Sequence, residues 1–372
     1  MARVSAKQTP STLGGGTYGT VRKEGKYAVK TFKSVCSTIQ EFTAFQCLRD
    51  RRSVLKAYSC DLRKKEVKME LGDLDLSKWL DRFIEPPDAI RWGILRDIVE
   101  GLRDIHELHL IHGDLKPSNI IIIYDKDHMP RAKIADLGFV SLAPYAKIKR
   151  TALAFRPEKI VHESGHDMFS LGVIIYELFS GGRKLSKKVS HKAMQDYALR
   201  HIKNKKAREL AYLLTDRDYR KRPSATNILN TFFRTDLDTV SEWSGDLSLP
   251  GDWDLRASPS SSDSIEISTE FMKWVIRSMN VVSASINGIS KARLKHGTKA
   301  LLAFIARNGV IEADCVLYIV AMLLIVTSNF GPSGFTEVMC AEVCGRPVNE
   351  LLIAVENLIR DEQTVDMIMA PY

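Results

Sequence analysis

Two changes in the spacing of apolar residues divide the chain into three parts. Residues 1–235 alternate short apolar runs, typical of strands, with longer stretches whose apolar residues recur every three or four positions, typical of helices. Residues 236–266 are poor in apolar residues and rich in Ser, Asp, Pro and Gly, which indicates a linker. Residues 267–372 show helical spacing only. We therefore predict an α+β domain, a linker and an all-helical domain.

The first part contains candidates for both kinds of element. Residues 27–30, 67–71 and 120–123 are short apolar runs of the kind that forms strands. Residues 38–49 and 88–109 have the spacing of amphipathic helices.

The last part is predicted to hold five helices, over residues 268–283, 290–307, 311–328, 334–344 and 347–360. The third helix is apolar on all sides from Cys315 to Val326, so it should be the central one, wrapped by the others. This run is too short to span a bilayer, and we expect a core helix and no membrane partner.

Length and composition narrow the class of protein. A chain of 372 residues has room for two or three domains. Its six cysteines show neither metal-ligand spacing nor a small disulfide framework, which favours a reducing compartment. The first seven residues are polar and do not resemble a signal peptide. We therefore expect a soluble protein that is cytoplasmic and/or nuclear.

The net charge of +9 is unevenly distributed. Between Asp236 and Glu266 there are eight acidic residues and one basic residue, so the rest of the chain carries about +16. This excess indicates either a solvated basic surface around an anion site or an attraction to acidic substrates or nucleic acid. No nucleic-acid motif accompanies the charge, so we favour the first interpretation and expect no nucleic-acid partner.

The segment His-Gly-Asp-Leu-Lys-Pro-Ser-Asn, residues 112–119, carries the most specific chemistry. Asp114, Lys116 and Asn119 place a carboxylate, an ammonium and a carboxamide within six residues. Phosphoryl transfer from ATP to a hydroxyl requires such a set, as a base, a cation for the γ-phosphate and a Mg²⁺ ligand. An Asp and an Asn at this spacing alone more often mark a capped turn. The flanking motifs therefore decide between a capped turn and a phosphoryl-transfer site.

Motifs that fit the same chemistry flank this segment in order. Glycines at 14, 16 and 19 would let the backbone approach phosphates, because no Cβ intervenes. A strand ending in Lys30 follows, and Glu41 is the only acid between Lys30 and Asp50. After the segment come motifs centred on Asp136, Glu158, Asp167 and Arg222.

Together these motifs resemble a Ser/Thr protein kinase over residues 1–235. The resemblance implies a bilobal α+β fold with a small β-rich N-lobe and a helical C-lobe. It also implies ATP and Mg²⁺ as cofactors and a protein substrate. The implied nucleotide-binding positions are Leu13, Gly14, Gly15, Gly16, Thr17, Tyr18, Gly19 and Val21 of the Gly-rich loop, Ala28 and Lys30 of the next strand, and Met69, Glu70 and Leu71 of the hinge.

The same resemblance implies the catalytic roles. Glu41 would position Lys30 against the phosphates, although the spacing between them is short, of a sort seen in compact viral kinases. Asp114 would be the base and Lys116 the charge stabiliser. The implied metal ligands are Asn119 and Asp136, and the implied structural groups are Asp167 and the Glu158/Arg222 pair.

The catalytic segment departs from many kinases at Gly113, which stands where an Arg usually pairs with a phosphorylated activation loop. Ser141, Tyr145 and Thr151 are the only hydroxyl residues of the corresponding loop, and none is an obvious activating site. We therefore expect activity without loop phosphorylation. The position of Lys116 favours Ser/Thr over Tyr substrates.

The last part of the chain resembles a cyclin box in residues 298–305, 327–329 and 355–359. In cyclins a Lys and a Glu at two of these positions contact the kinase partner; Glu356 is present here, and Asn329 replaces the Lys. Residues 37–41 are similar to the corresponding helix of cyclin-dependent kinases. The resemblance implies a kinase–cyclin-box contact, intramolecular or intermolecular, with activation in cis. The alternatives are a substrate-docking bundle and a pseudokinase scaffold.

Overall fold

The structure, a computed structural model, describes ten ranges of the chain. They are residues 12–16, 19–142, 153–157, 163–185, 190–233, 290–308, 312–330, 337, 340–341 and 346–370. Several expectations fall outside them, namely those for Thr17, Tyr18, Tyr145, Thr151, Glu158, the linker, the helix over 268–283 and most of the helix over 334–344.

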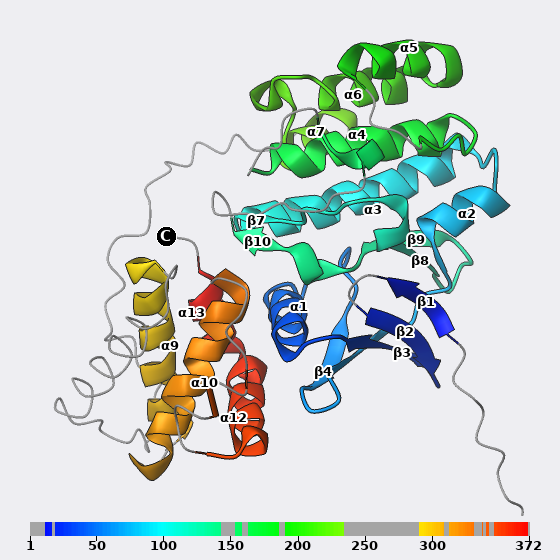
Figure 1. Ribbon diagram of the computed structural model, residues 1–372. Helices are drawn as coiled ribbons and strands as arrows, with labels where there is room; N and C mark the ends of the chain where they lie inside the picture. The colour runs from blue at the N-terminus through cyan, green and yellow to red at the C-terminus, as the bar shows by residue number, and fades with distance from the viewer. Residues whose placement is uncertain are drawn as a thin grey trace, which may run out of the picture.

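The N-terminal lobe is a five-stranded antiparallel sheet with one helix (Figure 1). Its strand order is β1-β2-β3-β5-β4. The strands are β1 (Thr12–Gly16), β2 (Gly19–Glu24), β3 (Tyr27–Phe32), β4 (Ala57–Asp61) and β5 (Glu66–Glu70).

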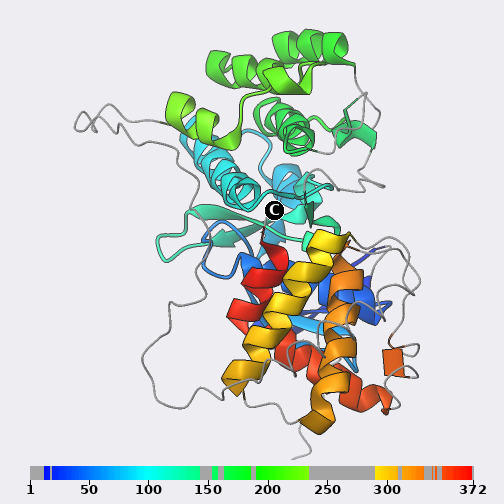
Figure 2. The ribbon, with the colours of Figure 1, turned by 90° about the vertical axis from the view of Figure 1, so that its left-hand side faces the viewer.

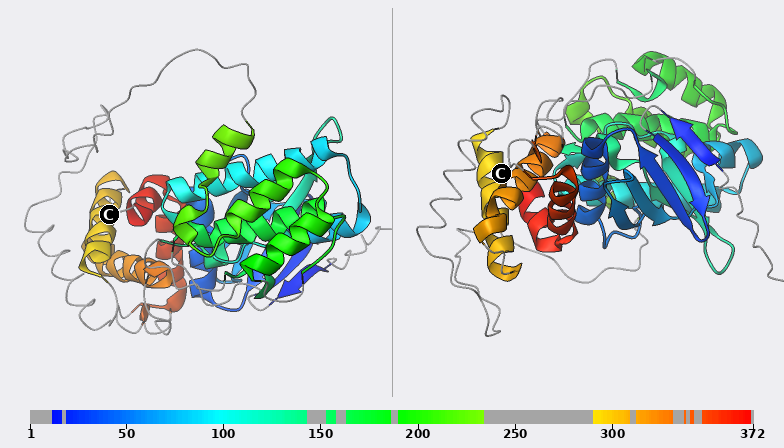
Figure 3. Two further views of the ribbon diagram at one scale, coloured as in Figure 1. Left: turned by 90° about the horizontal axis from the view of Figure 1, so that it is seen from above. Right: turned by 60° about the horizontal axis from the view of Figure 1, so that its bottom comes forward.

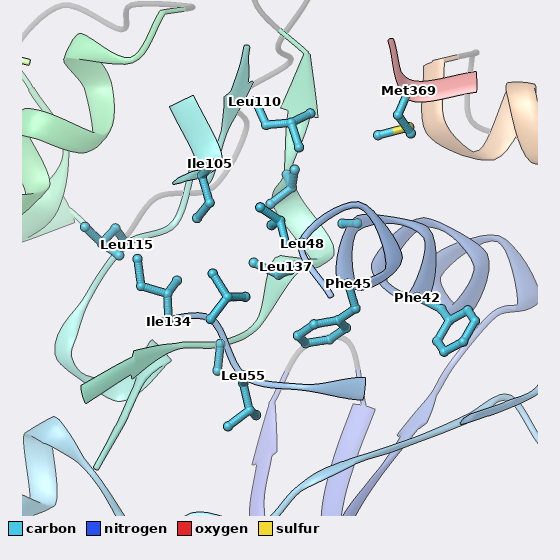
Figure 4. Packing of buried hydrophobic residues seen from close by; sticks show 14 of the residues in the cluster. Phe42, Phe45, Leu48, Leu55, Ile105, Leu110, Leu115, Ile134, Leu137 and Met369 are labelled. Atoms are coloured by element: carbon cyan, nitrogen blue, oxygen red, sulfur yellow. The ribbon is translucent and has the colours of Figure 1, made fainter. Parts of the chain in front are cut away.

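Helix α1 (Val35–Cys47) begins three residues before the predicted start. The reason is Ser34, whose side chain accepts a hydrogen bond from Ser37 N at 3.2 Å and caps the helix. Ile39, Phe42 and Phe45 are buried, and Figure 4 shows the two rings on the helix close to the sheet.

The C-terminal lobe is mainly helical and continues the kinase-like order of elements. Its helices are α2 (Leu76–Arg82), α3 (Asp88–Glu107), α4 (Gly165–Phe179), α5 (His191–His201), α6 (Lys205–Leu214) and α7 (Ala225–Phe232). Its small sheets contain β6 (Leu74–Asp75), β8 (Ile120–Tyr124) and β9 (Pro130–Ile134), and β7 (Leu110–Ile111) with β10 (Ser141–Leu142). Short 3-10 helices cover 117–119, 137–139, 153–155 and 219–221. The α+β prediction is confirmed.

The last part of the chain forms a helical bundle, as predicted. Its described helices are α9 (Lys291–Asn308), α10 (Glu312–Phe330), α12 (Val348–Arg360) and α13 (Glu362–Met369). Residues 319–326 of α10 are all buried, and α10 packs against α9 and α12, which confirms its central place. No helix within the described ranges has the length and apolar character needed to cross a bilayer.

Helix α13 is absent from the sequence-based prediction, which ended the last helix at residue 360. The chain turns at Asp361, whose side chain accepts a hydrogen bond from Thr364 N at 2.8 Å and caps a new helix. Val365 and Ile368 then bury one face of it. An N-capping Asp followed by this spacing was the available signal.

The bundle lies against the outer side of α1. Helices α10, α12 and α13 all pack on α1, which Figure 3 shows between the bundle and the strands of the N-lobe. In Figure 2, seen from the bundle side, its helices stand in front of that lobe. Helix α1 therefore has one face toward the sheet and another toward the bundle.

The close packing of α3 on β9 gives a stability prediction. An added Cβ at Gly101 would lie 2.8 Å from both Ile134 Cδ1 and Ser53 O, whereas one at Gly93 on the same helix would meet nothing within 4 Å. Overpacking costs about 1–3 kcal/mol, and Gly→Ala in a helix gains about 1 kcal/mol. We expect Gly101→Ala to lower the free energy of unfolding in urea and Gly93→Ala to raise it. Equal effects of the two substitutions would contradict this packing.

Candidate active site

A cleft of about 750 Å³ lies between the two lobes and has a size typical of ligand sites. It brings together most of the residues singled out from the sequence. These are Leu13, Gly14, Gly15, Gly19, Val21, Ala28, Lys30, Glu41, Met69, Glu70, Leu71, Asp114, Lys116, Asn119 and Asp136. Gly16 is the last residue of β1.

Three charged side chains from distant segments meet in the cleft. Lys30 on β3 donates to Glu41 Oε2 on α1 at 2.5 Å and to Asp136 Oδ1 at 2.6 Å. Only 1% of Glu41 is exposed, and 8% of Lys30. Burial of charges is unfavourable unless they are paired, so this arrangement holds only while α1 stays against the sheet.

The surroundings shift the pKa values of all three groups. Burial raises the pKa of Glu41 to about 7, and the nearby Lys30 opposes this shift. Burial disfavours the Lys30 ammonium, but the carboxylates of Glu41 and Asp136 outweigh it and raise the pKa of Lys30. Burial likewise disfavours the Asp136 carboxylate, but Lys30 outweighs it and lowers the pKa of Asp136. Above neutral pH, Lys30, Glu41 and Asp136 are therefore mainly in their charged forms.

The second cluster lies in the segment between β7 and β8. Lys116 Nζ donates to Asp114 Oδ2, and Asn119 Nδ2 donates to Asp114 O at 2.8 Å and to Asp114 Oδ2 at 3.3 Å. Asp114 and Asn119 are buried at the floor of the cleft, and Lys116 is partly exposed. A carboxylate, an ammonium and a carboxamide thus converge at one place.

The backbone of this segment is held from below by α4. Asp167 accepts hydrogen bonds from His112 N at 2.8 Å and Gly113 N at 2.9 Å, which confirms its predicted structural role. His106 Nε2 lies 2.9 Å from the same carboxylate, and although burial opposes the charge, this contact lowers the pKa of Asp167. Gly113 has φ +77°, a left-handed conformation that favours Gly and disfavours the Arg found in many kinases.

Asp136 also adopts a left-handed conformation, with φ +60°. Asp tolerates this region better than most residues, and strain of this kind is common at functional sites. Two residues on, a Cβ at Gly138 would lie 2.9 Å from Glu41 Oε2. Gly138 therefore leaves room for the carboxylate that pairs with Lys30.

One wall of the cleft is formed by β5 and the residues after it. Met69 is buried opposite Ala28 in the β3–β5 ladder, as expected of a residue at the back of the cleft. The backbone N–H of Glu70 donates to Lys56 O at 2.8 Å, so this donor is used within the N-lobe, while Glu70 itself lines the cleft. Leu71 and the following Gly72 line the cleft.

Several lining residues were missed from the sequence. Ile121 is half-buried between the fully buried Ile120 and Ile122, so the alternation of β8 points it to the opposite side, into the cleft. Gly72 allows its approach, since an added Cβ there would lie 1.9 Å from Ile121 Cγ2. The other missed lining residues are Leu55, Gly72, Asp73, Leu74, Asp75, Ser77, Lys78, Ser118, Ala135 and Phe139.

Arg222, which was predicted to pair with Glu158, forms hydrogen bonds with two backbone carbonyls. Arg222 is buried and donates to Asp216 O at 2.8 Å and to Gly165 O at 2.6 Å. Burial lowers the pKa of Arg222 to about 10. Arg222 therefore joins the first residue of α4 to the loop after α6, while Glu158 lies outside the described ranges.

The cleft offers oxygen ligands of the kind that Mg²⁺ prefers, namely the carboxylate of Asp136 and the carboxamide oxygen of Asn119. Asn119 uses its amide nitrogen toward Asp114, which leaves its oxygen as the atom for a cation. Among the described residues there is no cluster of three or more His, Cys, Asp or Glu that could hold a metal. A cation here would therefore need oxygens from a bound phosphate as well.

Comparisons with known proteins fit this geometry. Residues 8–233 match the family described as protein kinase domain. Serine/threonine-protein kinase ULK3 of Homo sapiens is 26% identical over 245 residues, 57% of this chain and 51% of that protein. Serine/threonine-protein kinase ATG1a of Arabidopsis thaliana is 32% identical over 114 residues, 29% of this chain and 18% of that protein. Serine/threonine-protein kinase PknL of Mycobacterium tuberculosis is 34% identical over 111 residues, 27% of each.

The chain spans about half the length of ULK3 and smaller shares of the other two relatives. The family match ends at residue 233, next to the end of α7, and leaves the helical bundle outside it.

Proposed function

The chain belongs to the protein kinase family, and we propose that it transfers the γ-phosphate of ATP to serine and threonine hydroxyls of protein substrates. The observation that carries this proposal is the convergence of two clusters in one cleft. Lys30, Glu41 and Asp136 form the first, and Asp114 with Lys116 belongs to the second.

Each cluster suits one part of the reaction. Lys30, held by Glu41, would neutralise and orient the ATP phosphates. Asp114 would accept the proton of the attacking hydroxyl, and its position beside Lys116 keeps a cation near the transferred group. Phosphoryl transfer depends mainly on such positioning and charge stabilisation.

Mg²⁺ would be held by Asp136 and Asn119, and when bound it would neutralise charge on the phosphates. In the structure Asp136 is paired with Lys30, so the carboxylate is already directed into the phosphate end of the cleft. Kinase-family members use ATP and Mg²⁺ as standard.

The competing function is that of a pseudokinase scaffold, which binds partners without catalysis. Pseudokinases usually lack one of the chemical groups. Here Lys30, Glu41, Asp114, Asn119 and Asp136 are all present and share the cleft, which favours an enzyme.

We also propose that the C-terminal bundle, which resembles a cyclin box, activates the kinase in cis. Its packing on α1 supports this, because α1 carries Glu41. Polar contacts to the neighbouring hairpin add support: Glu356 Oε1 accepts from Leu62 N at 2.8 Å, and Arg360 Nη2 donates to Cys60 O at 3.1 Å. Asn329, which replaces the Lys of cyclins, instead donates to Ile325 O of its own helix at 2.9 Å.

Covalent linkage makes this contact easier to maintain. Linkage in one chain gives the second domain an effective concentration in the range of about 1 mM, so a modest interface can stay closed. The remaining alternative is that the bundle binds the protein substrate. In that case removing the bundle would not change the position of α1.

Loss of the proposed base gives the first test. We expect Asp114→Ala to lower kcat by about 10²- to 10⁴-fold, because proton transfer loses its acceptor. ATP affinity should stay nearly unchanged, because Lys30 and Asp136 remain. The measurement is radiolabelled phosphate transfer to a generic basic protein, beside ATP binding by calorimetry. Asp127→Ala in the exposed β8–β9 turn is the matched control, and wild-type turnover in Asp114→Ala would remove the assignment.

The pKa of Glu41 gives a pH prediction. Its value of about 7 means that the carboxylate is protonated below neutrality and can no longer hold the Lys30 ammonium. We expect kcat/KM to be constant above about pH 8 and to fall by about tenfold per pH unit well below the pKa. Glu41→Gln should be weakly active and should lose this step, since its side chain does not titrate. A flat wild-type profile down to about pH 6 would refute the prediction.

Activation in cis is tested by separating the two domains. We expect residues 1–240 alone to have at least about tenfold lower kcat than the full chain, because α1 loses its outer support. Residues 260–372 added in trans should restore activity in a concentration-dependent manner. Equal activity of residues 1–240 and the full chain would favour the docking alternative.

A further inference from the structure

The end of α1 carries an arginine that joins the two domains. Arg49 lies two residues beyond the last residue of α1. Its Nη1 and Nη2 donate to Asp366 Oδ1 and Oδ2 at 3.1 Å and 3.0 Å, and its Nε lies 3.2 Å from Glu362 Oε2. Its Nη1 also donates to Gln46 O at 2.8 Å, so the guanidinium is tied to the helix end itself.

The two acids are presented on one face of α13. Glu362 and Asp366 are four residues apart, a spacing that stacks their side chains along the helix. The guanidinium bonds both oxygens of Asp366, a bidentate geometry that is stronger and more directional than a single ion pair. Arg49 therefore recognises this face of α13 in a fixed orientation.

Helix α13 is itself held at both ends by arginines of α9. Arg293, only 3% exposed, donates from Nη1 to Ile368 O at 3.1 Å and to Ala370 O at 2.8 Å at the C-terminal end. Arg307 Nη2 donates to Asp361 Oδ2 at 2.5 Å at the N-terminal end. The acids that meet Arg49 thus stand on a helix whose position is set by the bundle core.

Apolar packing is incomplete at the place where Arg49 acts. A cavity of about 410 Å³ lies between the end of α1, β7 and α13. Leu110, Met369 and Cys47 are among its lining residues, and Figure 4 shows Leu110 and Met369 both above α1. Because this pocket is open to solvent and is lined by Arg49 and Asp366 themselves, the polar contact lies where fewer side chains pack between α1 and α13.

We propose that Arg49 is a positioning residue that fixes the C-terminal end of α1 against α13 and thereby keeps Glu41 within reach of Lys30. Eight residues separate Glu41 from Arg49, about 12 Å along the chain if it were helical throughout. Rotation of α1 about its sheet contacts would move Glu41 away from Lys30. The inference rests on the proposed activation in cis and names the contact through which it acts.

The opposing interpretation is an ordinary surface ion pair. The side chains of Asp366 and Glu362 are 51% and 61% exposed, and exposed single pairs contribute about 0–1 kcal/mol. Arg49 differs by its two acidic partners on α13, its bidentate geometry and its bond to Gln46 O. Its effect is expected on the orientation of α1, and therefore on kcat, more than on global stability.

Charge reversal in the full-length chain tests the proposal. We expect Arg49→Glu to lower kcat by about tenfold, a coupling typical of linked sites, with little change in the thermal unfolding midpoint. The variant that combines Arg49→Glu with Glu362→Lys and Asp366→Arg should recover kcat to within about threefold of wild type. Arg49→Lys keeps the charge but loses the bidentate fork, so its kcat should be intermediate.

A matched ion pair far from α1 serves as the control. Lys184 lies 2.6 Å from Asp81 in the C-lobe, with both side chains exposed. Lys184→Glu should leave kcat unchanged, because this pair touches neither α1 nor the cleft. Salt should lower the kcat of the wild type, whose two acidic partners are exposed, and should not lower that of Arg49→Glu, which has lost the attraction.

Two outcomes would overturn the proposal. The first is an Arg49→Glu variant with kcat within about twofold of wild type. The second is a loss of kcat that the combined reversal does not recover, which would give Arg49 a structural role only. If residues 1–240 alone are fully active, the proposed activation in cis is wrong. If residues 1–240 are inactive while the full-length Arg49→Glu variant is fully active, activation in cis stands and only the proposed role of Arg49 is wrong.

Discussion

The buried ion pair between Lys30 and Glu41 is the interaction on which the active cleft depends. Both groups lose hydration on burial, and the attraction between them compensates only while they remain in contact. Separating them would leave a carboxylate in an apolar pocket and a lysine free to pair with Asp136 alone. The position of α1 is therefore an energetic switch for the cleft, because α1 carries one partner and the sheet carries the other.

Helix α1 packs against both the sheet of the N-lobe and the C-terminal bundle. Its inner residues, such as Phe45, pack toward the sheet, while its outer side is covered by α10, α12 and α13. In a kinase domain alone this outer side would face solvent, and only the inner side of the helix would be held. The bundle replaces solvent with apolar packing along the middle of α1, and with directional polar contacts at Arg49 and at the hairpin near Leu62.

The sequence was sufficient for the parts of the fold that depend on local chemistry. Lys30, Asp114 and Asp136 stand in short motifs with fixed roles, so their meeting in one cleft could be anticipated. Ile121 was not anticipated, because a run of four isoleucines hides which ones face a ligand until the register of β8 is known. The same holds for Arg49 and α13: their contact joins residues 317 positions apart, and no local pattern predicts it.

Within the described ranges, the contacts that hold the active elements of this chain involve no phosphorylated group. Gly113 excludes the arginine that would bind a phosphorylated loop, and the start of that loop is held by β10–β7 pairing and by Gln40 Nε2, which lies 3.5 Å from Val140 O. At the end of α1, the two carboxylates facing Arg49 supply about the charge of one phosphate, −1.5 to −2, but no phosphatase can remove it. Under the proposed activation in cis, control would act on docking of the bundle, the step that brings these carboxylates to Arg49.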